Sequence, residues 1–202
     1  MSDALRALAR RGELRRLKRG VQLITEGEIG DTLYIVLEGR LRAFAAGSDG
    51  REVTYGIYGA GEYVGEMGLD GGPRSAHVEV LEPTLCAVVV RRTLEAFLDE
   101  HPRFAFELLA KVIRRARAAT MGLKQIALND VYGRLKALLE SIAQPNVDGS
   151  ADGGAPTHLE MSQQLGCSRE MVSRIMKDLE RGGYVETGRR RVRLLKALPA
   201  KW

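Results

Sequence analysis

Side chains that bind metals or form disulfides are scarce in this sequence: of its 202 residues, two are cysteine and three are histidine. Cys86 and Cys167 lie far apart, and neither has the cysteine or histidine neighbours that a metal-binding motif places at short spacing. Zinc sites and disulfide frameworks both need such clusters. We therefore expect two buried, inert thiols, no disulfide and no metal site.

Long apolar runs are missing as well. No run approaches the roughly 20 residues that a membrane-spanning helix needs, and residues 1–10 are charged, without the apolar centre of a signal peptide. We therefore expect a cytoplasmic protein with no membrane partner. The remaining composition, 45% hydrophobic and 28% charged, is that of an ordinary globular protein, and the length leaves room for two domains.

Charge is unevenly distributed along the chain. The net charge of +5 favours a polyanionic partner. Residues 1–100 contain 13 Lys and Arg against 16 Asp and Glu, whereas residues 101–130 contain 6 against 2 and residues 131–202 contain 12 against 8. The basic excess is therefore confined to the second half of the chain.

Residues 20–90 alternate short apolar runs with glycine-containing turns. Residues 33–37 and 85–90 are two such runs, and the spacing of the turns leaves about five residues for most strands. This pattern is typical of short antiparallel strands. We predict an α+β protein in which residues 1–101 form an antiparallel, jelly-roll-like β-roll.

A long helix is predicted to follow the roll. No glycine occurs between Val90 and Gly122, and Pro102 can open a helix. Steps of four and three residues separate six positions along one face of it: Leu109, Ile113, Ala116, Thr120, Leu123 and Ala127. This heptad seam predicts a dimerisation helix over residues 102–128. A separate, solvated basic face is expected from Lys111, Arg114, Arg115 and Arg117. The alternative is a helix that packs on its own roll.

The last third of the chain, residues 129–202, is predicted to form a second domain. It begins with a helix over residues 129–143, and a flexible polar loop over residues 147–156 follows. The next helix is expected to start at Thr157, because this residue forms a Thr-x-x-Glu capping box with Glu160.

Two short helices joined by a tight turn follow. Gly166 ends the first helix, and Ser168 caps the second, which runs to about Arg181. A turn of about three residues is the spacing of a DNA-reading helix pair. Residues 184–195 are expected to form a hairpin wing. We therefore predict a winged helix-turn-helix domain that binds double-stranded DNA.

The second helix of this pair carries side chains suited to base recognition. Four of them project from its amino-terminal half, the part that enters the major groove: Arg169, Glu170, Ser173 and Arg174. Arginine pairs with guanine O6 and N7, and glutamate accepts a hydrogen bond from cytosine N4. The opposite stripe is expected to be core: Val172, Ile175, Met176 and Leu179.

Other groups of this domain are better placed to meet DNA phosphates, which position a protein without specifying sequence. We assign this role to four basic side chains: Lys177, Arg189, Arg190 and Arg191. The two helix-cap residues Thr157 and Ser168 are also expected to belong to the DNA-binding site. The alternative for the arginine cluster is a solvated wing.

Residues 64–76, here called the cassette, are the most informative stretch of the first half. Glycines let backbone N–H groups approach an anion, Arg74 offers a forked guanidinium, and Ser75 adds a hydroxyl. A carboxylate repels phosphate, so Glu66 is better used to accept hydrogen bonds from a sugar. Together these groups describe a ligand in which a phosphate is fused to a ribose. The alternative for Glu66 and Arg74 is a surface salt bridge.

Taken in order, these motifs resemble the cyclic AMP receptor protein / fumarate–nitrate regulator superfamily of bacterial transcription regulators. The cassette of that superfamily contains Gly-Glu-x-x-Leu and then Arg-Ser or Arg-Thr. The resemblance assigns Gly65 and Glu66 to ribose, and Arg74 and Ser75 to phosphate. Residues 166–174 match the recognition-helix pattern Gly-Cys-Ser-Arg-Glu-x-Val-x-Arg.

The resemblance implies a homodimeric transcription regulator that has no catalytic residues and is controlled allosterically by a cyclic nucleotide. Cyclic AMP is the expected ligand, a palindrome of TGTGA-like half-sites is the expected DNA, and a contact with RNA polymerase is implied as well. In the family, two adjacent hydroxyl residues on the long helix contact the adenine. Here the pair is Ala119-Thr120, and a single threonine hydroxyl does not separate adenine from guanine because it can donate or accept.

Several alternatives stay open at this point. A related regulator that needs no ligand, or that answers cyclic GMP or cyclic di-GMP, is compatible with Ala119, and Thr120 can instead bond its own helix. A cyclic-nucleotide-controlled enzyme is more remote, because no Ser/His/Asp, metal-ligand or Walker constellation occurs outside the roll. The lack of cysteine before Cys86 excludes the iron–sulfur-sensing relatives. His77 is expected on a strand rather than on a haem.

Overall fold

The computed structural model describes residues 1–145 and 151–201, which form two compact units. The first unit contains Met1–Ala45 and Thr54–Arg117, and the second contains Ala46–Val53 and Ala118–Trp202. The division falls inside the long helix α3 (Phe104–Leu128), so the domain boundaries expected after residues 101 and 128 stay predictions. No helix in the described ranges is long and apolar enough to cross a membrane.

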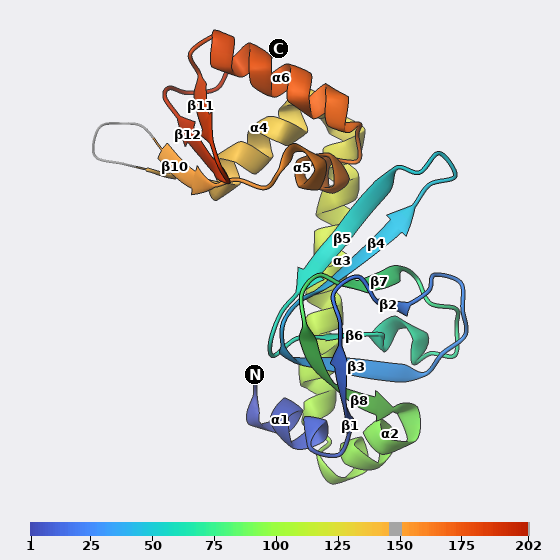
Figure 1. Cartoon of the computed structure of the whole chain (residues 1–202). Coiled ribbons are helices and arrows are strands. Elements are labelled where there is room, and N and C mark those ends of the chain that lie inside the picture. Colours follow the sequence, from blue (N-terminus) through green and yellow to red (C-terminus); the bar gives the residue numbers. More distant parts are fainter. Residues whose placement is uncertain (146–150, 202) are drawn as a thin grey trace. The chain divides into compact units, whose positions relative to one another are not determined.

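The first unit is built on a roll of two four-stranded sheets, as predicted (Figure 1). One sheet has the strand order β1 (Glu13–Leu17), β8 (Thr84–Val90), β3 (Thr32–Glu38) and β6 (Tyr63–Val64). The other has the order β2 (Gln22–Ile24), β7 (His77–Val80), β4 (Leu41–Ala46) and β5 (Glu52–Tyr58). Strand β3 pairs antiparallel with both of its neighbours. This confirms the antiparallel roll.

Strands β3 and β8 of the first sheet are buried on both faces, which explains their nearly continuous apolar runs. The helices α1 (Asp3–Ala9) and α2 (Arg91–Glu100) and the start of α3 cover one face, where Leu33 and Ile35 of β3 pack with Phe97. The second sheet covers the other face, where Val36 packs with Cys86 and Val78. Alternate residues of β3 therefore serve two different cores.

The two cysteines differ in burial. Cys86 lies in the core between the sheets, and burial raises the pKa of its thiol to about 11. A thiol that stays protonated at neutral pH is unreactive, as expected for this residue. Cys167 is only half-buried, so the expectation of full burial is wrong for it, although burial raises its pKa too.

The second unit contains the helices α4 (Val131–Ile142), α5 (His158–Leu165) and α6 (Arg169–Arg181). A sheet with the order β11 (Val185–Gly188), β12 (Arg191–Leu194), β10 (Ala151–Gly154) and β9 (Gln144–Pro145) completes it (Figure 1). Helix α4 begins two residues later than predicted because Asp130 caps it and accepts a hydrogen bond from Gly133 N at 2.7 Å. Likewise, α3 begins at Phe104, after a turn over residues 102–103.

The flexible loop predicted over residues 147–156 is wrong in part. Residues 151–154 form β10, which pairs antiparallel with β12. The Asp-Gly-Gly sequence that suggested a turn serves close packing instead, since a Cβ on Gly153 would lie 2.4 Å from the Ile142 carbonyl oxygen. Residues 146–150 lie outside the described part of the chain.

Candidate functional sites

The cassette is built on a turn that requires glycine. Gly65 has a backbone φ of +95°, and a Cβ there would lie 2.4 Å from the Thr32 carbonyl oxygen. A Cβ on Gly68 would lie 2.5 Å from the Gly30 carbonyl oxygen. The 3₁₀ helix η1 (Glu66–Gly68) therefore packs directly on the backbone at the start of β3.

The Arg74 side chain is folded into the roll, and 7% of the residue is exposed. Its Nη1 donates to the Gly65 carbonyl at 2.7 Å, and its Nη2 donates to the Thr32 carbonyl at 3.0 Å. These bonds use two of the five N–H donors of a guanidinium. The other donors can bind an anion, and the carbonyl bonds orient the group that would do so.

Glu66 forms an ion pair with Arg115 of α3, and both side chains are largely buried, with 10% and 21% of their surface exposed. Arg115 also donates to the Tyr63 carbonyl, and its guanidinium carbon lies 4.5 Å from the centre of the Tyr58 ring. No ion pair joins Glu66 to Arg74 within the described residues. The Glu66 carboxylate is therefore positioned by α3, and a ribose would have to share it with Arg115 or displace Arg115.

The predicted solvated basic face of α3 is wrong for two of its four side chains. One turn before Arg115, the Lys111 ammonium pairs with Glu62 at 3.1 Å and lies 5.0 Å from the centre of the Tyr63 ring. Burial by itself would raise the pKa of Glu62, but the hydrogen bond from Gly59 N and the Lys111 charge hold it below its usual value. These contacts place Lys111 and Arg115 on the roll, because α3 packs there on β6.

Tyr63 is the most deeply buried of the aromatic groups at this point. Burial raises its pKa to about 12, even though the charge of Arg115 favours the phenolate. Tyr58 also has a raised pKa because of burial. Both rings therefore remain neutral and offer their faces to the cations of α3.

The last two residues of the predicted ligand set are exposed. Ser75 Oγ donates to Met67 Sδ at 3.3 Å, a weak bond that a ligand phosphate can replace. Thr120 lies on α3 and belongs to the second compact unit, so its contact with a base stays a prediction.

The helix-turn-helix forms as predicted. Thr157 and Glu160 make both hydrogen bonds of the capping box, Gly166 ends α5 with a φ of +63°, and Ser168 Oγ accepts from Met171 N at 3.2 Å. The inner stripe of α6 is buried in the core of this unit: Val172, Ile175, Met176 and Leu179. Four charged side chains predicted to meet DNA are exposed on the same helix: Arg169, Glu170, Arg174 and Lys177.

Ser173 differs from its neighbours on α6. It is partly buried, and its hydroxyl lies 2.9 Å from Nδ1 of His158, the first residue of α5. Its predicted contact with a base would therefore compete with a bond between the two helices.

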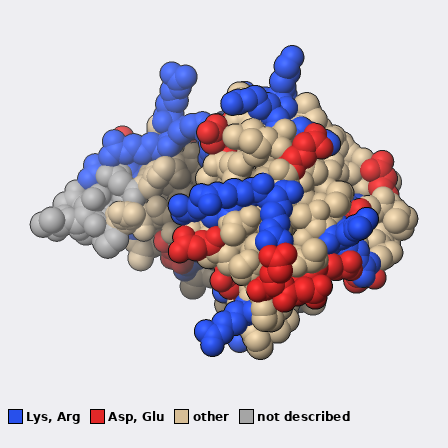
Figure 2. Space-filling view, turned by 90° about the horizontal axis from the view of Figure 1, so that it is seen from below, with Lys and Arg blue, Asp and Glu red and all other residues tan. Residues whose placement is uncertain are grey.

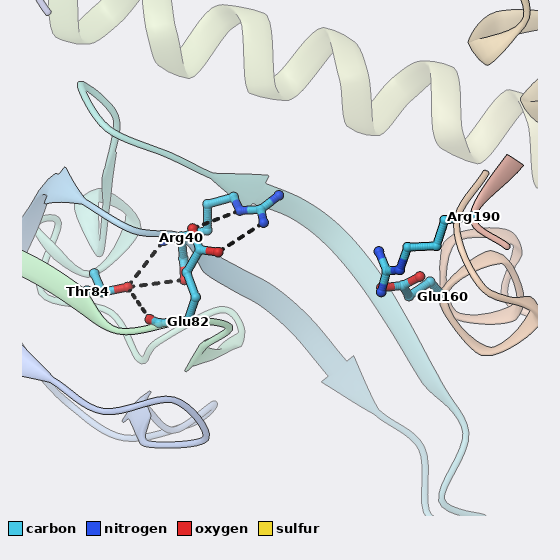
Figure 3. Close-up of polar contacts among 5 residues, drawn as sticks. All are labelled: Arg40, Glu82, Thr84, Glu160 and Arg190. Carbon is cyan, nitrogen blue, oxygen red and sulfur yellow. Dashed lines mark hydrogen bonds and ion pairs between the residues drawn. The ribbon is translucent and has the colours of Figure 1, made fainter. Parts of the chain in front are cut away.

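The wing is the hairpin β11–β12, with Gly188 opposite Arg191 and with Arg189 and Arg190 at its tip. Arg190 adopts a left-handed φ of +52°, and its Nη2 lies 3.4 Å from Glu160 Oε1 (Figure 3). The three wing arginines are exposed. A phosphate would compete with Glu160 for Arg190 and would find Arg189 at the tip beside it.

Basic and acidic side chains are interspersed over the face drawn in Figure 2. The candidate DNA-binding surface is defined by the exposed side chains of α6 and the wing.

Sequence reasoning did not identify two residues that touch the candidate sites, Arg115 at Glu66 and His158 at Ser173. A signal for Arg115 was present. Two carboxylates four residues apart, Glu62 and Glu66, are matched by two cations four residues apart on one helix face.

Comparison with known proteins agrees with this arrangement. Residues 14–101 match the cyclic nucleotide-binding domain family, and residues 133–198 match the Crp-like helix-turn-helix domain family. The chain is 30% identical over 190 residues to the CRP-like cAMP-activated global transcriptional regulator of Mycobacterium tuberculosis, covering 91% of this chain and 84% of the relative. It is 33% identical over 172 residues to the cyclic AMP receptor protein of Thermus thermophilus, covering 84% and 78%.

The fold is also similar to that of a solved regulator. The c-di-GMP responsive global regulator CLP of Xanthomonas campestris superimposes with a TM-score of 0.82 at 23% identity, covering 95% of this chain and 97% of that one. At that identity the likeness concerns the fold alone.

Proposed function

This chain belongs to the family of cyclic AMP receptor protein-like transcription regulators, and from that premise we propose that it is a homodimer that answers cyclic AMP and binds a palindrome of TGTGA-like half-sites. Members of the family join a cyclic-nucleotide-binding domain to a DNA-binding domain and are regulators rather than enzymes. A contact with RNA polymerase and a cytoplasmic location stay predictions.

The observation that carries the proposal is the two-sided character of α6. One stripe of this helix is buried in its own domain, while Arg169, Glu170 and Arg174 are exposed near its capped amino-terminal end. An exposed carboxylate between arginines is a liability on a DNA-binding face unless it accepts a hydrogen bond from cytosine. These side chains suit a half-site with several G·C pairs, and Lys177 and the wing arginines would add phosphate contacts.

The ligand is proposed from the cassette. Arg74 retains N–H donors next to the exposed hydroxyl of Ser75, which suits a phosphate, and Glu66 with the Gly65 backbone suits a ribose. Cyclic AMP is favoured because both relatives compared above are named for it. Cyclic di-GMP is the second candidate, because Ala119 removes one hydroxyl from the family's adenine contact and a regulator of the same fold is named for cyclic di-GMP.

The dimer is proposed from the unpartnered apolar side chains of α3. Leu109, Ile113 and Leu123 of the predicted seam are exposed, as is Phe106 one step earlier, at 74%. Burial of apolar surface stabilises a complex by roughly 25 cal/mol per Å² removed from water. A second α3 would bury all four residues along one stripe. Ala127 of the seam lies outside the described side chains.

Calorimetric titration with cyclic AMP, cyclic GMP and cyclic di-GMP, followed by DNA binding with each nucleotide, tests this function. We expect cyclic AMP to bind and to increase affinity for the TGTGA palindrome over a scrambled duplex. Binding of cyclic di-GMP alone would replace cyclic AMP as the ligand. Equal affinity for both duplexes at all ligand concentrations would contradict the proposed recognition.

A further inference from the structure

The side chains of His158 and Ser173 join the two helices of the DNA-binding pair. His158 directly follows the Thr157 cap of α5, and Ser173 lies in the amino-terminal half of α6. The imidazole Nδ1 and the serine hydroxyl are 2.9 Å apart. The described residues give His158 no other hydrogen bond or ion pair, so its Nε2 retains its hydrogen-bonding capacity.

We propose that His158 is a proton-linked contact to a DNA phosphate and that Ser173 positions its ring. The inference rests on the DNA-binding function proposed above and adds to it a phosphate contact and a pH dependence. It also changes the expected role of Ser173 from a contact with a base to the orientation of a neighbouring side chain.

The hydrogen bond works in both protonation states of the ring. In the neutral state the Ser173 hydroxyl donates to Nδ1, and the ring proton on Nε2 can donate to a phosphate oxygen. When a second proton binds, Nδ1–H donates to Ser173 Oγ, and Nε2–H presents a charged donor to the phosphate. Because a hydroxyl both donates and accepts, His158 can gain charge without a change of partner.

Charged side chains lie on the elements that adjoin this pair. On α6, the exposed charged side chains near Ser173 in sequence are Arg169, Glu170, Arg174 and Lys177. On α5, Glu160 is occupied by Thr157 N and the wing residue Arg190. On α4, Arg134 donates to the Leu165 carbonyl at the last residue of α5. A bound duplex would add negative phosphates beside these groups.

The sign of the effect follows from linkage. A phosphate beside the ring favours the imidazolium, so DNA binding takes up protons in the range where histidine titrates, roughly pH 5 to 8. DNA affinity should therefore rise as the pH falls through that range. A lysine or arginine at position 158 would give a contact of constant charge.

The test is equilibrium binding of the full-length protein, saturated with cyclic AMP, to a labelled TGTGA palindrome across roughly pH 5.5 to 8 at several salt concentrations. Acidification should tighten binding by up to roughly a hundredfold for a symmetric dimer, a tenfold step from each imidazole. The salt slope should steepen by about two, one for each imidazolium.

Three variants and one control separate the proposal from a structural role. His158→Gln can still bond Ser173 and a phosphate but does not titrate, so it should bind DNA with no such pH dependence. His158→Lys should bind tightly at every pH, and Ser173→Ala should retain a weaker pH effect. His101→Gln, which removes a histidine of the first unit, should behave as wild type.

The proposal is overturned if His158→Gln shows the same pH dependence of DNA affinity as the wild type. It is also overturned if the affinity and salt slope of the wild type do not change with pH. If the variants change only the unfolding temperature, the His158–Ser173 hydrogen bond serves only to hold α5 and α6 together, and the proposal is wrong. A non-specific duplex at low salt is a second probe, because phosphate contacts do not depend on sequence. pH-dependent binding to that duplex without preference for the palindrome would support His158 and contradict the proposed recognition of TGTGA.

Discussion

Replacing Arg74 with leucine should reduce folding stability as well as ligand affinity, because the guanidinium already bonds the carbonyls of Gly65 and Thr32. A hydrogen bond with a charged group contributes roughly 1.5–3 kcal/mol, and leaving a buried acceptor unpaired costs about 1–3 kcal/mol. Burial of the leucine side chain offsets roughly 1.5–3 kcal/mol of the loss. Two such bonds total roughly 3–6 kcal/mol, so after the leucine offset we expect the free energy of unfolding to fall by about 2 kcal/mol in the absence of ligand.

Urea unfolding measures that loss, and calorimetric titration with cyclic AMP measures the effect on binding. Loss of one charge-assisted pair to a phosphate, at roughly 1.5–3 kcal/mol, should weaken affinity by about ten- to 150-fold. Arg74→Lys keeps the charge and provides the measurement if the leucine variant does not fold. The matched control is Arg40→Leu, since Arg40 forms a solvent-exposed pair with Glu82 (Figure 3) and should change stability little.

Unchanged unfolding of Arg74→Leu would refute the structural role of its carbonyl bonds. Unchanged cyclic AMP affinity in a folded Arg74→Leu variant would refute the assignment of the cassette. The two results are independent, because the first is measured without ligand.

The dimer, the DNA interface and the response to acid each give a further prediction. Wild type should sediment as a dimer and Ile113→Glu should weaken it by placing like charges in the seam; a wild-type monomer at micromolar concentration would contradict this. Glu170→Ala should relax discrimination at one base pair per half-site by roughly 1–3 kcal/mol with little change in salt slope. Arg190→Ala should weaken binding to all duplexes alike and reduce the salt slope by about two for a symmetric dimer. If Glu170→Ala weakens binding to all duplexes alike, or if Arg190→Ala changes the base preference instead, the assignment of base recognition to α6 and of phosphate contacts to the wing is wrong. Because the pKa of Glu62 is lowered in the folded state, its contribution to stability is present above its usual value of 4.5 and is lost as the pH falls through the lowered pKa. The urea midpoint of wild type should therefore drop more steeply below that pH than the midpoint of Glu62→Gln, and parallel curves would count against the Lys111 ion pair.

Sequence reasoning succeeded where the cause of a structure lies within a few residues. The Thr157 capping box, the Gly166 helix end and the Ser168 cap each depend on groups within about four positions. The apolar runs of β3 and β8 likewise predicted buried strands, because burial on both faces leaves no place for polar side chains.

Sequence reasoning failed where a local structure depends on residues far away along the chain. Helix periodicity left Lys111 in solvent, because nothing local shows that Glu62, 49 residues away, will lie beside it. Strand β10 has the composition of a turn and is ordered by its pairing with β12. In the same way, helix position predicted that Ser173 contacts a base, whereas its hydrogen bond to His158 depends on the packing of α5 against α6.

The two ion pairs between α3 and the roll are spaced one helical turn apart. Glu62 and Glu66 are four residues apart, as are Lys111 and Arg115. A shift of this part of α3 by a fraction of a turn would break both pairs at once, whereas a shift of four residues, about 6 Å, would bring Lys111 opposite Glu66. A sugar that bound Glu66 would therefore compete with one of the two ion pairs that hold this part of α3 in register with the roll.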